Sequence, residues 1–119
     1  MCIVVVDDEC ELRELMSHLL EDEGYRVVTF SHPRAVTMLH ESDERPHLFL
    51  IDMVLPGMSG IELARWLREQ GFEQTPKIAM SASEHHVREA RLSCLFRAAI
   101  DKPFDIDDLL DTVEQNLLA

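Results

Sequence analysis

Positive charge is scarce in this sequence of 119 residues. It contains only two lysines, Lys77 and Lys102, and its formal net charge is −12. Binding of nucleic-acid phosphates requires clustered lysine and arginine side chains. We therefore expect no direct binding of nucleic acid by this domain. Any function that needs a lysine ammonium group has only these two candidates.

Cysteines are also few. Cys2, Cys10 and Cys94 lack the spacing of a metal site, and their odd number argues against an oxidising compartment. We expect three reduced thiols that pack as small apolar groups.

Long apolar runs are absent. The run Ile3–Val6 is far too short to cross a membrane or to act as a targeting segment, and no basic segment leads into it. We therefore expect a cytoplasmic protein without a membrane-bound part. The length suits one domain with one core, which we assign to residues 1–119.

Short strand-like runs alternate with helical patterns along the chain. The strands are expected at 3–6, 26–30, 48–51, 77–80 and 98–100, and the helices at 12–24, 33–40, 59–71, from 85 onward and at 105–117. Spacing of about twenty to thirty residues between strands is what a helical crossover requires. The alternation predicts an α/β fold: a doubly wound, flavodoxin-like sheet of five parallel strands in the order 2-1-3-4-5, with helices on both faces.

Polar residues follow four of the five predicted strands. Asp7 and Asp8 follow the first strand, and Asp52, Ser81 and Lys102 follow the third, fourth and fifth. These strands are neighbours in the order 2-1-3-4-5, and ligands bind beyond the carboxyl ends of such strands. Each residue alone could be a helix cap, a turn residue or a surface charge. Together they predict one pocket with three carboxylates, a hydroxyl and an ammonium group.

This set of groups suits phosphoryl transfer. Closely packed carboxylates are unfavourable unless a cation offsets them, and hard oxygen ligands suit Mg²⁺. Asp52 can then be the nucleophile that forms an acyl phosphate, while Asp8 and Asp52 hold Mg²⁺ and Asp7 orients metal-bound water. Lys102 and Ser81 would contact the other phosphoryl oxygens. Without metal, the like charges predict raised pKa values in the carboxylate cluster.

The sequence resembles response-regulator receiver domains along nearly its whole length. The resemblance is carried by Val4–Glu9, Leu50–Gly60, Ser81-Ala82 and Lys102-Pro103-Phe104. It implies a phosphorelay module that takes its phosphoryl group from the phosphohistidine of a sensor histidine kinase or a histidine phosphotransfer protein. It also implies Mg²⁺ dependence, a backbone carbonyl ligand from Val54, a cis Lys102–Pro103 peptide and slow hydrolysis of the aspartyl phosphate. Such a module is a signalling domain rather than an enzyme that acts on other substrates.

Two alternatives stay open. Ala99 occupies the position, three residues before Lys102, where receivers usually carry an aromatic residue that takes part in output. A binding module of the same fold that no longer uses phosphate is therefore one alternative. A phosphatase with an aspartyl nucleophile is the other, although such enzymes need an acid where this chain has Val54.

His85 and His86 point in different directions on a helix and make a poor pair of metal ligands.

Overall fold

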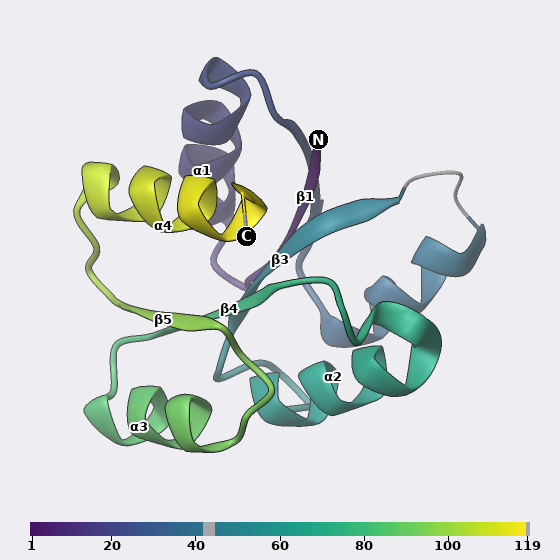
Figure 1. Cartoon of the computed structure of the whole chain (residues 1–119). Coiled ribbons are helices and arrows are strands. Elements are labelled where there is room, and N and C mark those ends of the chain that lie inside the picture. The colour runs from purple at the N-terminus through teal and green to yellow at the C-terminus, as the bar shows by residue number, and fades with distance from the viewer. Residues whose placement is uncertain (42–44, 119) are drawn as a thin grey trace.

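The computed structural model describes residues 1–41 and 45–118, which form a five-stranded parallel sheet flanked by helices (Figure 1). The strands are β1 (Cys2–Val6), β2 (Arg26–Phe30), β3 (Pro46–Asp52), β4 (Lys77–Ser81) and β5 (Ala98–Asp101). The helices are α1 (Cys10–Asp22), η1 (Pro33–Glu41), α2 (Gly60–Leu67), η2 (Arg68–Phe72), α3 (Glu84–Leu92) and α4 (Ile106–Leu118). The strand order is β2-β1-β3-β4-β5, which confirms the predicted topology.

The sheet is buried on both faces. α1 and α4 cover one face, and η1, α2 and α3 cover the other (Figure 1). β1 shows the consequence for a strand whose side chains alternate. Ile3 and Val5 pack into the cluster beneath α1 and α4, whereas Val4 and Val6 pack into the cluster beneath η1 and α2. Burial of each such side chain stabilises the fold by about 1.5–3 kcal/mol, so the apolar runs fix the central strands and their register.

The edge strands β2 and β5 are less buried than the central strands. Arg26 at the start of β2 is exposed, and β5 is largely half-buried. None of the helices in the described parts of the chain is long and apolar enough to cross a membrane.

The predicted helix boundaries are confirmed where the capping signals are strong. Ser59 and Glu62 form a capping box in which each side chain accepts a hydrogen bond from the other residue's amide. Asp105 accepts a hydrogen bond from the amide of Asp107 at 2.9 Å and caps the start of α4. Gly24, with a φ of 91°, follows the end of α1.

Two helices differ from the prediction. The second, expected as a helix at 33–40, is a 3₁₀-helix at Pro33–Glu41. The third was expected to run to Gly71, but its regular α-helical part ends at Leu67 and continues as a π-helical turn to Phe72. Gly71 lies within that turn with a φ of 97°, a conformation that glycine adopts without strain.

Gly60 allows the start of α2 to lie directly against the end of β3. A Cβ atom at Gly60 would lie 2.7 Å from the carbonyl oxygen of Asp52, closer than real Cβ contacts. The amide of Gly60 donates a hydrogen bond to the carbonyl oxygen of Met53 at 3.0 Å. The backbone around Asp52 is therefore packed directly against Gly60, the first residue of α2.

Candidate functional site

The predicted polar residues meet at the carboxyl edge of the sheet. Pairing of β4 with β5 places Ser81 opposite Asp101, so Lys102 follows directly beside Ser81. A depression of about 450 Å³ opens there. Its lining includes all the predicted side chains except Asp7, together with Glu9, Ala82, Ser83 and His86. Val54 also lines it, so the predicted backbone ligand stands at the same pocket.

Three carboxylates form the acidic part of this site. Asp7, Asp8 and Asp52 each offer an oxygen atom within 4.8 Å of the others. Asp7 is fully buried and Asp52 is 7% exposed, whereas Asp8 is exposed. Hard oxygen donors with one open side match the ligand preference of Mg²⁺. The residues present therefore fit that cation.

Lys102 pairs with the two buried carboxylates. Its Nζ lies 2.7 Å from Oδ2 of Asp7 and 3.2 Å from Oδ2 of Asp52. Burial alone would lower the pKa of Lys102, but the hydrogen bond to Asp7 and the charge of Asp52 outweigh it and raise the pKa. The Lys102–Pro103 peptide is cis, as the resemblance predicted.

The other lysine is excluded from this site. Lys77 is the first residue of β4, at the opposite end of that strand from Ser81. Its Nζ donates hydrogen bonds to the carbonyl oxygens of Phe72 and Thr75, at 2.6 and 3.0 Å. Lys77 thus holds the loop after η2, and Lys102 remains as the lysine of the pocket.

Backbone amides hold the remaining side-chain oxygens in place. Oδ1 of Asp7 accepts from the amide of Glu9 at 2.9 Å, and Oδ1 of Asp52 accepts from the amide of Val54 at 3.2 Å. Oγ of Ser81 accepts from the amide of Ser83 at 3.1 Å, which leaves its hydroxyl hydrogen able to donate. Both oxygens of Asp7 therefore accept hydrogen bonds, Oδ1 from the Glu9 amide and Oδ2 from Lys102, and both oxygens of Asp52 do the same with Val54 and Lys102.

The electrostatics of Asp52 differ from the prediction in their main cause. We expected neighbouring negative charges to raise carboxyl pKa values. The pKa of Asp52 is indeed raised, but burial is the largest cause and the charge of Asp7 only adds to it. The amide of Val54 and the charge of Lys102 partly offset the rise.

Replacing Asp52 by asparagine is expected to stabilise the metal-free protein at neutral pH. A raised folded-state pKa means that folding disfavours the ionised carboxylate, by about 1.4 kcal/mol for each unit of elevation. The cost arises as the pH climbs from the ordinary aspartate pKa through the raised one. The gain should therefore vanish at about pH 3, where Asp52 is protonated in the folded and unfolded states alike. Urea unfolding in EDTA at both pH values tests this, and a variant less stable than the parent at neutral pH would contradict it.

Two of the four lining residues that were not predicted, Glu9 and His86, have titratable side chains. Glu9 is exposed, with Oε2 4.0 Å from Nζ of Lys102, and only its place directly after Asp7 and Asp8 could have indicated it. His86 was considered only as a metal ligand paired with His85. Its place five residues after Ser81, in the first turn of α3, is the signal that could have directed attention to the pocket.

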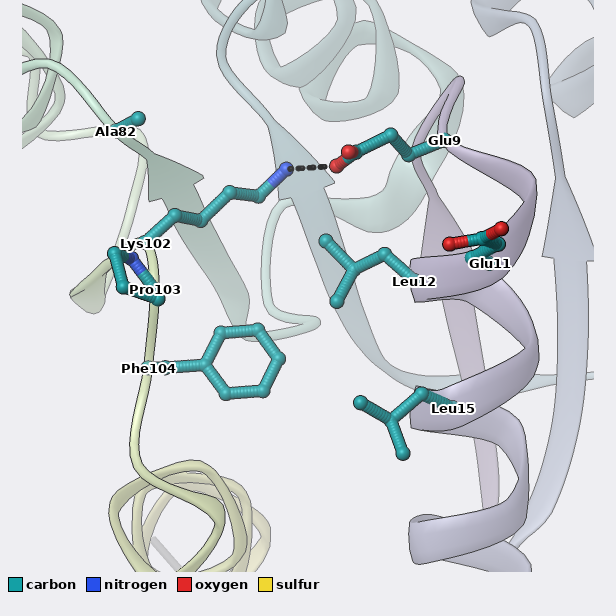
Figure 2. Close-up of a pocket in the computed structure, with 8 residues that line it drawn as sticks. All are labelled: Glu9, Glu11, Leu12, Leu15, Ala82, Lys102, Pro103 and Phe104. Carbon is teal, nitrogen blue, oxygen red and sulfur yellow. Dashed lines mark ion pairs between the residues drawn. The ribbon is translucent and has the colours of Figure 1, made fainter.

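An apolar groove adjoins the pocket on the other side of Lys102 (Figure 2). Leu12 and Leu15 of α1 face Pro103 and Phe104 across it, and the acidic side chains Glu9 and Glu11 lie along the α1 side. Lys102 thus separates a charged pocket from an apolar groove.

Comparison with known proteins decides the family. A family model described as the response regulator receiver domain matches residues 3–114. This chain belongs to that family. The receiver is 32% identical over 118 residues to sporulation initiation phosphotransferase F of Bacillus subtilis, an alignment that covers 97% of this chain and 92% of that protein.

Solved structures agree with this assignment. The response regulator protein TrrA of Thermotoga maritima, in complex with Mg²⁺ and BeF, is 30% identical with a TM-score of 0.83, and 96% of each chain is covered. The chemotaxis protein CheY4 of Vibrio cholerae is 27% identical with a TM-score of 0.85, and 97% of each chain is covered. The protein is therefore a receiver domain of two-component signalling.

Proposed function

We propose that residues 1–119 form one receiver domain that accepts a phosphoryl group on Asp52 in an Mg²⁺-dependent reaction. The donor is the phosphohistidine of a sensor histidine kinase or a histidine phosphotransfer protein, and phosphorylation switches the interaction with an output domain or partner protein. The observation that carries the proposal is the Lys102 ammonium group, which lies between the buried carboxylates of Asp7 and Asp52.

Asp52 is the nucleophile in this proposal. One of its carboxylate oxygens attacks the phosphorus of the donor, an acyl phosphate bond forms, and the bond from phosphorus to the donor's imidazole nitrogen breaks. Oδ1 of Asp52 is held by the amide of Val54, while Oδ2 faces Lys102. The carboxylate is thus oriented before the donor arrives, which matters because such transfer depends on positioning and on neutralisation of charge.

The other residues neutralise or orient charge. Lys102 is positioned to move from Asp52 to a phosphoryl oxygen while it keeps its shorter contact with Asp7. The Ser81 hydroxyl can donate to a second oxygen. Asp8, Asp52 and the Val54 carbonyl would hold Mg²⁺, with Asp7 orienting its water. When bound, the cation would supply positive charge to the phosphoryl oxygens.

Treatment with acetyl phosphate tests the site assignment. We expect intact mass spectrometry to show one added phosphate with Mg²⁺ present, and none in EDTA. Asp52→Asn should remain unlabelled, because its amide cannot act as the nucleophile. Asp101→Asn is the matched control, since Asp101 is an exposed carboxylate at the end of β5 and should leave labelling unchanged. Equal labelling of Asp52→Asn and the parent would refute the proposal, and it would favour a binding module that does not use phosphate at Asp52.

A further inference from the structure

His86 combines two features that the proposed chemistry does not use. It lines the pocket that contains Asp52 and Lys102. Its Nδ1 atom is buried without a hydrogen-bond partner, the one such side-chain nitrogen or oxygen among the residues that the structure describes. Buried polar atoms are nearly always paired, so this nitrogen needs a partner that the protein itself does not supply in this position of the ring.

The charges around the pocket indicate that a ligand on the α3 side is an anion. The side formed by the segment after β1 carries the carboxylates of Asp8 and Glu9. Lys102, the cation of the pocket lining, is already engaged by Asp7 and Asp52. On the side formed by α3, the imidazole of His86 adds N–H donor capacity without adding a negative charge.

The start of α3 also favours an anion. Ser83 precedes the helix and lines the pocket, yet its side chain makes no capping hydrogen bond. The first amides of a helix carry partial positive charge, and an anion near them is stabilised. The α3 side of the pocket therefore offers donors that no capping side chain occupies.

We propose that His86 donates an N–H hydrogen bond to an oxygen of the phosphoryl group on Asp52. This contact rests on the proposed function and adds a donor from α3 to those from Lys102 and Ser81. Rotation about the χ2 angle of histidine has a broad, shallow energy profile, so torsional strain does not oppose a turn of the ring. Turning towards the phosphoryl group exchanges an unpaired nitrogen for a hydrogen bond to an anion, and phosphorylation itself drives the change.

The neighbouring histidine provides a matched control. His85 is exposed, its Nε2 lies 3.8 Å from Oε2 of Glu89, and it does not line the pocket. The two rings contact edge to face with 5.5 Å between their centroids. A change at His85 therefore removes a similar ring from the same helical turn without removing a donor from the pocket.

Binding of beryllofluoride, a mimic of the phosphoryl group, tests the contact by titration calorimetry in saturating Mg²⁺. His86→Ala should weaken beryllofluoride binding by about tenfold, the value of one hydrogen bond to a charged acceptor. His86→Gln, which keeps an N–H donor, should recover part of the loss, and His85→Ala should bind as the parent does. Binding of Mg²⁺ alone should be equal in all four proteins, because His86 contacts the anion and not the cation.

Nitrogen NMR of the imidazole rings supplies a measurement that does not depend on a variant's folding. In the parent, beryllofluoride should shift a ring nitrogen of His86 strongly and those of His85 little. Three results would each overturn this contact while leaving the proposed function in place. His86→Ala could bind beryllofluoride as the parent does, or it could lose Mg²⁺ binding as strongly as beryllofluoride binding. The third such result is a His86 ring that beryllofluoride does not shift in the parent. Failure of the parent itself to bind beryllofluoride would overturn both.

Discussion

Replacing Lys102 by methionine is expected to lower the free energy of unfolding of the metal-free protein by about 3–5 kcal/mol. The lysine side chain is 14% exposed, and it pairs with a fully buried Asp7 and a nearly buried Asp52. Methionine has a similar length and volume, so the loss reports mainly on the charge. Two buried carboxylates would remain without a cation, and denaturant unfolding in EDTA measures the cost.

Two further variants test whether the loss comes from the buried carboxylates or from any change of charge near Lys102. Glu9 lies 4.0 Å from Lys102 but is 69% exposed, so Glu9→Gln should change the stability by less than about 1 kcal/mol. Adding Asp7→Asn to Lys102→Met should recover part of the loss, because an unpaired buried charge is removed. If Lys102→Met unfolds with the parent's midpoint, the buried ion pair contributes no stability.

The pH dependence of this loss follows from the raised pKa of Lys102. A lysine whose folded-state pKa is raised contributes stability that is fully present below its ordinary pKa of about 10.4. That contribution is lost as the pH rises through the raised folded value. The difference between the parent and Lys102→Met should thus persist through neutral pH and shrink in strong alkali. It should also shrink in acid, where the carboxylates that Lys102 offsets are protonated.

The sequence predicted best those features of the fold that depend on a single physical requirement. The apolar run at β1 must be buried on both faces, and the end of each central strand must meet its neighbours at one edge of the sheet. The alternation of strands and helices predicted the order 2-1-3-4-5, and that order placed Asp7, Asp8, Asp52, Ser81 and Lys102 at one edge of the sheet.

The features that were not predicted depend on how several elements pack together in three dimensions. The segment Pro33–Glu41 lacks a sustained helical pattern, and its 3₁₀-helix is held to the sheet by burial of Val36 and Leu39. Burial of Asp52 depends on how closely α2 and the following loops approach, which sequence spacing does not reveal. His86 was missed because the direction of a side chain at the start of a helix depends on where that helix packs.

Magnesium is expected to stabilise the parent strongly. At a hundredfold excess over its dissociation constant, the cation should raise the free energy of unfolding by about 2.7 kcal/mol, since it binds the folded state and not the unfolded one. The three carboxylates within 4.8 Å of one another are the basis of this expectation. Asp8→Asn should gain much less from Mg²⁺, because the variant loses one of the proposed ligands.

The same variant also separates cation binding from relief of repulsion. For a partly buried carboxylate cluster, the like charges predict that Asp8→Asn stabilises the metal-free protein by about 1 kcal/mol or more. Asp8 is exposed, so the change in EDTA should be only a few tenths of a kcal/mol. Thermal melts in MgCl₂, and in NaCl of equal ionic strength, then isolate the binding of the cation from screening. Glu11→Gln, an exposed acid in the first turn of α1, should gain from Mg²⁺ as the parent does. Equal gains for the parent and Asp8→Asn would mean that the cation binds elsewhere, and the assignment of Asp8 as its ligand would be wrong.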